Sequence, residues 1–188
     1  MKKFFIFCIM SIYLFGNTQE DSYFTCRIPN DIMLTYLLTE QTKKRDLYYP
    51  FILQINYSKE KSPEKFENVR NIILQIRGNE ALNSKLYDCK NLQQCISTVE
   101  ALEQNGYMNY DIGPFQVNYY FNKNDLRYMF NFYGSYLLSC QYVTKLILEN
   151  GYSLDTLGMY NSKTPENKAK YLAAWVENYK LVNKSRED

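Results

Sequence analysis

The sequence of 188 residues contains no histidine. This absence excludes Ser-His-Asp and Cys-His nucleophilic catalysis, histidine-ligated zinc and any imidazole general base. Glycine is also scarce, with seven copies, and no two of them form a G-x-G pair. The glycine-rich phosphate loops of Rossmann and P-loop proteins are therefore excluded as well. Any catalysis by this chain uses carboxylates, hydroxyls, amides or thiols.

Long apolar runs are missing except at the amino end, where the first residues have the features of an export signal. Lys2 and Lys3 precede an apolar run over residues 4–15, which at about twelve residues is too short to span a bilayer comfortably. The run predicts a Sec-type signal peptide over residues 1–19 and a mature domain over residues 20–188. Gly16 suits a cleavage site but Leu14 does not, so a retained N-terminal membrane anchor is the alternative.

The mature chain is predicted to be electrically neutral and to contain two disulfides. Removing the two lysines of the signal takes away the formal net charge of +2, and a neutral chain has no electrostatic attraction for nucleic acid. Four cysteines follow the signal: Cys26, Cys89, Cys95 and Cys140. An even number behind an export signal predicts two disulfides in an oxidising compartment, and three pairings are consistent with the sequence. No C-x-x-C redox site or zinc tetrad is present, so no metal is expected.

Hydrophobic periodicity and turn signals predict an α+β fold that is mainly α-helical, with a small extended lobe near residues 50–90. Helices are expected at residues 31–43, 95–104, 135–149, 153–159 and from 164 onward. An extended stretch, an isoleucine-rich strand and a loop are expected at residues 51–57, 71–77 and 109–120, respectively. The inner face of the last helix is expected to carry Tyr171, Trp175, Tyr179 and Val182.

Glu40 is the first candidate catalytic residue. On a helix over residues 31–43, its side chain falls within an apolar arc that includes Tyr36 and Leu37. A carboxyl group held among apolar side chains has a raised pKa, which suits a general acid near neutral pH. The alternative is a solvated glutamate at a fraying helix end, turned toward the polar residues that follow it.

Two later segments carry polar groups at turns. In Asp111-Ile112-Gly113-Pro114-Phe115-Gln116, the Gly-Pro pair fixes a turn, and Gln116 offers a donor and an acceptor where the chain leaves it. Tyr160-Asn161 places a phenol and an amide after a short helix. Taken separately, the first segment is equally an interhelical turn capped by Asp111, and the second is an ordinary turn.

In this order, the three segments resemble the lytic transglycosylases of the lysozyme-like superfamily, and most closely the small exported enzymes associated with type IV secretion systems. That family has a catalytic Glu-Ser at the end of a buried helix, then a GLMQ-N motif, then a helix that leads to Ala-Tyr-Asn. The counterparts here, within residues 26–180, are Glu40-Gln41, Gly113-Pro114-Phe115-Gln116 with Asn118, and Met159-Tyr160-Asn161. The chain departs from the family at Gln41, which replaces the serine, and at Pro114-Phe115, which replace Leu-Met.

The resemblance implies a lysozyme-like fold and cleavage of peptidoglycan between N-acetylmuramic acid and N-acetylglucosamine. Glu40 would protonate the glycosidic oxygen and then accept the proton of the muramoyl 6-hydroxyl, which closes a 1,6-anhydro ring. This reaction requires neither a metal nor a cofactor. Tyr160 would hydrogen-bond near Glu40. The implied substrate-binding set is Gln116, Tyr160, Asn161, Phe115 and Asn118.

The family pattern also favours one disulfide pairing and one location. Cys26, just before the catalytic helix, would pair with Cys140 on a helix expected to pack beside it, which leaves Cys89 and Cys95 to form a local bridge. The resemblance places the protein in the periplasm. It implies peptidoglycan glycan strands and secretion-system components as partners.

Two other functions are compatible with the sequence. A hydrolytic muramidase would need a second acidic group to position water, and Asp111 is the candidate beside a motif. A non-catalytic module that binds glycan or scaffolds an envelope machine is favoured by the loss of the family serine at Gln41. Against that module, glycan binding alone would not require a protonatable group at Glu40.

Overall fold

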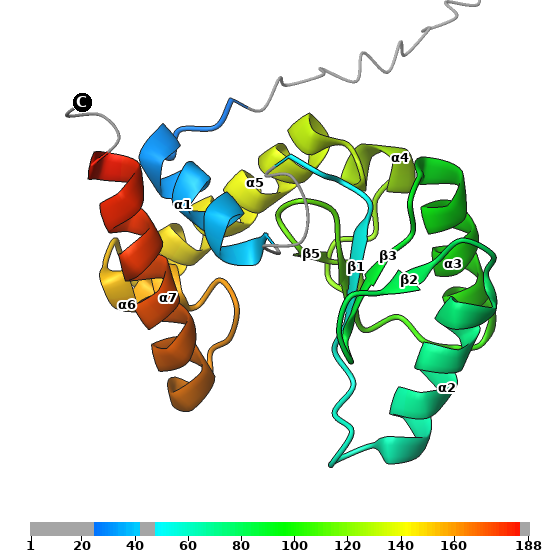
Figure 1. Ribbon diagram of the computed structural model, residues 1–188. Helices are drawn as coiled ribbons and strands as arrows, with labels where there is room; N and C mark the ends of the chain where they lie inside the picture. The colour runs from blue at the N-terminus through cyan, green and yellow to red at the C-terminus, as the bar shows by residue number, and fades with distance from the viewer. Residues whose placement is uncertain (1–24, 42–47, 185–188) are drawn as a thin grey trace, which may run out of the picture.

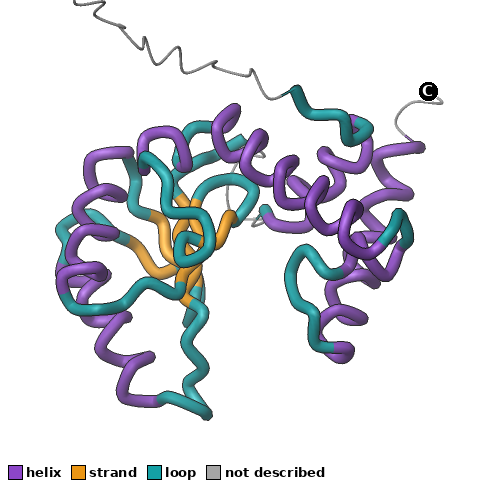
Figure 2. Tube along the Cα trace, turned by 180° about the vertical axis from the view of Figure 1, so that it is seen from behind, coloured by secondary structure: helices purple, strands orange, loops and turns teal. Residues whose placement is uncertain are grey.

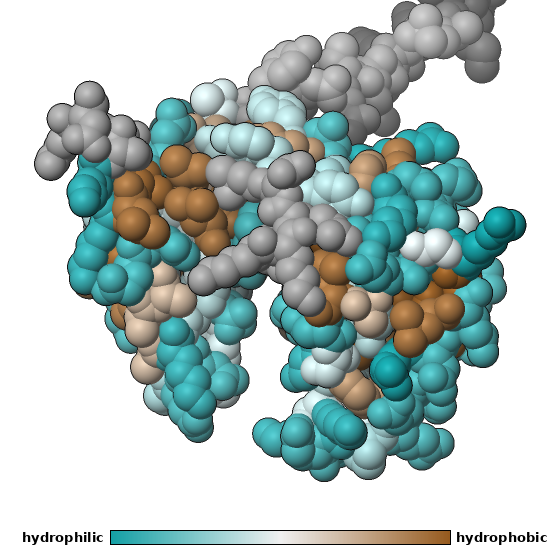
Figure 3. Space-filling model, in the orientation of Figure 1, coloured by the Kyte–Doolittle hydropathy of each residue, from teal (hydrophilic) through white to brown (hydrophobic). Residues whose placement is uncertain are grey.

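The computed structural model describes residues 25–41 and 48–184, so the predicted signal peptide over residues 1–19 lies outside the described residues. The chain forms two lobes (Figure 1), and the space-filling view shows a hollow between them that opens at the lower edge of the molecule (Figure 3). One lobe is built of helices. The other contains the sheet, with two helices on its outer side (Figure 2).

The helical lobe is formed by elements from both ends of the chain. It contains α1 (Asn30–Glu40), α5 (Phe132–Asn150), α6 (Leu154–Gly158) and α7 (Pro165–Lys184). α7 packs along α1 and α6, and α5 packs on α6. The ring of Tyr36, fully buried on α1, lies 5.8 Å from that of Trp175 on α7, and its hydroxyl donates a 3.0 Å hydrogen bond to the Leu157 carbonyl. The predicted inner face of the last helix is confirmed by the burial of Trp175 and Val182.

The second lobe is built on a five-stranded antiparallel sheet. Its strands are β1 (Ile52–Ile55), β2 (Glu80–Ala81), β3 (Leu86–Asp88), β4 (Tyr110–Ile112) and β5 (Val117–Asn118), in the order β2-β3-β1-β4-β5. Its helices are α2 (Pro63–Gln75) and α3 (Leu92–Gln104), and the short α4 (Leu126–Met129) contacts both α3 and α5. The predicted α+β, mainly helical fold with a small β lobe is therefore confirmed.

Each lobe contains one disulfide. Cys26, before α1, is bonded to Cys140 on α5, with 5.8 Å between the Cα atoms. Cys89, after β3, is bonded to Cys95 on α3, with 5.1 Å between the Cα atoms. Both expected pairings are confirmed, and they suggest an oxidising, exported compartment. Within the described ranges, no helix combines the length and the apolar character needed to cross a membrane.

One predicted strand is wrong. Residues 71–77 were expected to be extended because isoleucine favours strands, but α2 continues through them to Gln75. The buried residues Phe66, Val69 and Ile73 are spaced as one face of a helix, and that face packs toward α3. Residues 109–120, expected to be a loop, contain β4 and β5 on either side of the Gly-Pro turn. The first helix ends at Glu40, and residues 42 and 43 of the prediction lie outside the described residues.

Candidate active site

A cleft of about 840 Å³ lies between the two lobes. Figure 3 shows the hollow from the side on which the lobes separate. Amide side chains from both lobes are the most frequent kind in its lining: Gln54, Asn56, Asn109, Gln116, Asn118, Asn122, Gln141, Asn161 and Asn167. The predicted site residues that line it are Glu40, Gln116, Asn118, Tyr160 and Asn161. The structure thus brings together five of the residues singled out in the sequence.

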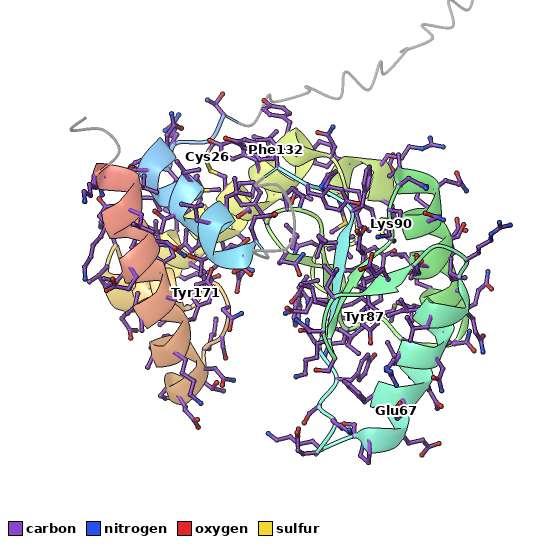
Figure 4. All side chains as sticks on the ribbon, viewed as in Figure 1. Cys26, Glu67, Tyr87, Lys90, Phe132 and Tyr171 are labelled. Atoms are coloured by element: carbon purple, nitrogen blue, oxygen red, sulfur yellow. A yellow bond between two sulfur atoms is a disulfide. The ribbon has the colours of Figure 1, made fainter. Side chains whose placement is uncertain are left out.

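Glu40 is the last residue of α1, where the helix reaches the cleft. Its Oε1 accepts a 2.5 Å hydrogen bond from the hydroxyl of Tyr171 on α7. Figure 4 shows Tyr171 in the helical lobe, on the helix beside α1. Within the described residues this is the only hydrogen bond to the Glu40 carboxyl group. Tyr171 thus positions one oxygen of the Glu40 carboxyl group.

The surroundings of Glu40 favour its protonated form. Part of the side chain faces the cleft, but the carboxyl group is surrounded by protein atoms, and burial raises its pKa to about 8. The hydrogen bond from Tyr171 acts in the opposite direction, and the negative charge of Asp111 raises the pKa further. The expected elevation of the Glu40 pKa is present. At neutral pH this group holds a proton that it can donate.

The Gly-Pro turn approaches α1 from the sheet lobe. Gly113 has a φ of 76°, and a Cβ atom there would lie 2.4 Å from the Met129 carbonyl oxygen, so only glycine fits. Gln41, the residue after α1, donates a 2.6 Å hydrogen bond from Nε2 to the Pro114 carbonyl. The residue that replaces the family serine thus connects the end of the acid-bearing helix directly to the turn.

Gln116 has an unusual backbone and an unsatisfied side chain. Its φ of 47° is in the left-handed region, which costs a non-glycine residue about 1 kcal/mol. Its Nε2 donates a 2.7 Å hydrogen bond to the Gly113 carbonyl, while Oε1 is buried and has no partner among the described residues. A buried acceptor without a donor is destabilising, and a ligand that supplies an N–H group would relieve the cost.

A row of polar residues crosses the sheet on its cleft side. Gln54 on β1 pairs with Asp111 on β4, which pairs with Asn118 on β5, and all three line the cleft. Their neighbours Leu53 and Ile112 are buried, as the alternation of a strand requires. Burial raises the pKa of Asp111 to about 6, although hydrogen bonds from Asn56 and from Asn118 Nδ2, at 2.7 Å, act to lower it. Asp111 is therefore mainly ionised at neutral pH, whereas Glu40 is mainly protonated.

Two sequence-based assignments need correction. Tyr160 was expected to hydrogen-bond near Glu40 and to help orient it, but its hydroxyl donates to the Phe115 carbonyl at 2.7 Å and lies 2.8 Å from Ser139 Oγ, and within the described residues no hydrogen bond joins it to Glu40. Tyr171 holds the acid instead. The Phe115 ring does not line the cleft, because it is 1% exposed and packs in the core near Phe132, with 5.8 Å between ring centroids.

The sequence contained a partial signal for Tyr171. Its position on the inner face of the last helix was predicted, but its contact with Glu40 requires the packing of α7 against α1, which periodicity does not specify.

The described part of the chain offers no cluster of three or more Cys, Asp or Glu residues that could hold a metal ion. Comparison with known proteins gives no match: no family model, no curated protein and no solved structure is similar enough to identify a relative.

Proposed function

We propose that this protein is a peptidoglycan lytic transglycosylase, which cleaves the β-1,4 bond between N-acetylmuramic acid and N-acetylglucosamine and leaves 1,6-anhydromuramoyl ends. The observation that carries the proposal is the state of Glu40. Its carboxyl group accepts a hydrogen bond from Tyr171 at the wall of a cleft between two lobes, and burial raises its pKa to about 8. Such a group is suited to protonate the oxygen of a glycosidic bond.

The proposed reaction uses this one carboxyl group twice. Glu40 donates its proton to the glycosidic oxygen as the bond from the muramoyl anomeric carbon to that oxygen breaks. The resulting carboxylate takes the proton of the muramoyl 6-hydroxyl, and the 6-oxygen forms a bond to the anomeric carbon. The sugar supplies its own nucleophile, so no water is consumed, and Glu40 ends in the protonated form in which it began.

The amide groups of the cleft support a ligand with acetamido substituents. Gln116 Oε1 and Asn118 Oδ1 are buried acceptors without a partner among the described residues, and both side chains line the cleft. Each sugar of peptidoglycan carries an acetamido N–H. Hydrogen bonds from two such groups would satisfy both oxygens, which supports a ligand of this kind.

A hydrolytic muramidase is the second candidate, and Asp111 is the observation that favours it. This carboxyl group lines the same cleft and lies near enough to Glu40 for its charge to raise the Glu40 pKa. Glycosidases that hydrolyse commonly use two carboxyl groups, one protonated and one ionised. The two candidates differ in whether water or the 6-hydroxyl attacks the anomeric carbon.

The test is digestion of purified peptidoglycan sacculi by the exported protein, with the soluble products identified by mass spectrometry. Glu40→Gln keeps the shape of the side chain and removes its proton, and Glu100→Gln, at an exposed position on α3, is the matched control. Anhydromuropeptides from the wild type and the control, but not from Glu40→Gln, are the expected result. Reducing-end products, one water heavier, would establish the muramidase. No product from any of the three, with binding to sacculi intact, would mean a glycan-binding module.

The three motifs resemble those of the small exported transglycosylases associated with type IV secretion systems. From this resemblance we propose that the protein acts in the periplasm to open the cell wall locally during assembly of an envelope-spanning secretion system, whose components would be its partners. Its two disulfides are compatible with this location.

A further inference from the structure

Three lysines line the cleft. Lys85 precedes β3 in the sheet lobe, Lys145 lies on α5, and Lys163 follows Tyr160-Asn161 between α6 and α7. They come from three separate elements and from both lobes. A ligand that occupies the length of the cleft therefore meets positive charge from both lobes, together with the neutral amide side chains of the lining.

Nearby acidic groups compensate these charges only in part. Lys85 lies near enough to the exposed Glu60 for its charge to contribute to lowering the Glu60 pKa. Lys145 Nζ lies 3.9 Å from Glu149 Oε1, but both side chains are largely exposed, and pairs of this kind are weak. Within residues 25–41 and 48–184, Lys85 and Lys163 form no ion pair. Two carboxyl groups also line the cleft: burial raises the pKa of Glu40 to about 8, so it is mainly protonated at neutral pH, whereas the pKa of Asp111, about 6, leaves that group mainly ionised. One negative charge in the cleft therefore stands against three positive ones.

The chemistry of the glycan gives these lysines a ligand. A strand of β-1,4-linked N-acetylglucosamine alone is uncharged. In peptidoglycan every second sugar carries a lactyl group, which ends either in its own carboxylate or in a stem peptide that has carboxylates. Negative groups therefore project from alternate sugars. The acetamido and hydroxyl groups along the strand can form hydrogen bonds with the neutral amide side chains that line the cleft.

We propose that Lys85, Lys145 and Lys163 select glycan strands that carry carboxylates on alternate sugars over uncharged strands of the same length. The inference rests on the proposed function, because it takes the cleft as a glycan-binding site. Exposed ion pairs are weak individually, so the preference arises from the three lysines together, and it decreases as salt screens the charges.

The experiment measures binding by calorimetry in the Glu40→Gln background, so that no ligand is consumed. Three soluble strands of equal length are compared: peptide-bearing strands, strands stripped to free lactyl carboxylates, and stripped strands whose carboxylates are converted to methylamides. Lys85, Lys145 and Lys163 are replaced together by glutamine. The matched control replaces three exposed lysines outside the cleft, Lys65, Lys170 and Lys180, with the same loss of charge.

At about 50 mM salt, we expect a charged strand to bind roughly tenfold more tightly than the methylamide strand. This advantage is lost in the cleft-lysine variant and at about 300 mM salt, and it is retained in the control. Preference for the stripped strand identifies the lactyl carboxylate as the ligand, and preference for the peptide-bearing strand alone identifies the stem peptide.

Equal affinity for all three strands, or a preference that survives loss of the cleft lysines, overturns the inference. Digestion of sacculi by the wild type separates this failure from failure of the proposed function. Cleavage without any charge preference overturns only the role of the lysines. Absence of both cleavage and strand binding overturns the proposed function and, with it, the lysine selection.

Discussion

Tyr171 and Glu40 are joined by a 2.5 Å hydrogen bond across a sequence separation of 131 residues. The contact exists because α7, near the end of the chain, packs against α1, the first helix. The orientation of the candidate acid therefore depends on the assembly of the whole helical lobe. A residue far from the motifs that resemble a known family thus contacts the candidate catalytic carboxyl group.

Tyr171→Phe is expected to move the pH dependence of the reaction. The hydroxyl favours the ionised form of Glu40, so its loss raises the Glu40 pKa, and the alkaline limb of kcat/KM moves to higher pH. Turnover falls by about tenfold because the carboxyl group loses its fixed orientation. Tyr179→Phe, on the same helix with a 3.4 Å contact to Asp31, is the control and leaves the limb in place. If the alkaline limb of kcat/KM does not move in Tyr171→Phe, Tyr171 does not set the pKa of Glu40.

Glu40→Gln is expected to stabilise the fold at alkaline pH. The Glu40 pKa is about 8 in the folded protein against an ordinary 4.5, so the folded state binds this proton more tightly. The resulting stability is fully present below pH 4.5 and is lost as the pH rises through about 8. The glutamine variant does not lose stability in this way. Its free energy of unfolding, measured by denaturation below pH 4.5 and above pH 8, should exceed that of the wild type only at the higher pH. Glu100→Gln should show no comparable change, and a pH-independent effect in Glu40→Gln would contradict the burial argument.

Asp111→Asn separates the two enzymatic candidates. A transglycosylase does not need Asp111 to position water, so we expect activity within about tenfold of the wild type, and anhydro products are retained. The loss of negative charge lowers the Glu40 pKa and moves the alkaline limb to lower pH. Asp155→Asn is the control. It breaks an ion pair with Lys168, neither residue lines the cleft, and it should change neither the activity nor the alkaline limb. Abolition of turnover by Asp111→Asn would favour the muramidase.

Gln41→Ser introduces the residue of the family motif, and we expect it to impair this protein. The substitution removes the 2.6 Å hydrogen bond to the Pro114 carbonyl, which costs about 1 kcal/mol of unfolding free energy and loosens the turn that bears Gln116. Both urea denaturation and turnover should report the loss. Gln104→Ser, at the exposed end of α3, controls for the general effect of serine at a helix terminus. Improved activity in Gln41→Ser would show that serine orients the acid here as well.

The two disulfides should contribute unequally to stability. The bond between Cys26 and Cys140 closes a separation of 114 residues and that between Cys89 and Cys95 a separation of 6, for which chain entropy predicts about 5 and about 2 kcal/mol. Paired alanine substitutions, compared by denaturant unfolding without reductant, test this order. Equal losses would mean that native-state contacts, rather than the entropy of the unfolded chain, determine the contribution.

The fold was predictable where hydrophobic spacing and turn residues agreed. Pro165 begins α7 as expected, and the apolar pattern before Gly151 predicted most of α5. The isoleucines of residues 71–77 misled because strand propensity depends on context, whereas the burial of Phe66, Val69 and Ile73 follows a helical period. The short β2 and α4 carried too few residues for any periodic signal.

The candidate site was predictable to the extent that it lies within local motifs. Glu40 could be singled out because its position on a helix and its apolar neighbours are local properties. The partner of Glu40 could not be, because which tyrosine reaches the carboxyl group is decided by helix packing, and Tyr171 rather than Tyr160 does so. Phe115 shows the same limit, since a turn residue can point into the core as easily as into the cleft.

The order of the four cysteines has a consequence for biogenesis. The Cys89–Cys95 bond lies, in sequence, between the two partners of the Cys26–Cys140 bond. Cys26 is therefore not bonded to the next cysteine that follows it in the mature chain, which is Cys89. A chain oxidised as it emerges from its amino end meets Cys89 before Cys140, and the first bridge open to it, between Cys26 and Cys89, is non-native. Maturation would then depend on thiol–disulfide exchange, in which a disulfide isomerase, rather than an oxidase alone, determines the yield of native protein.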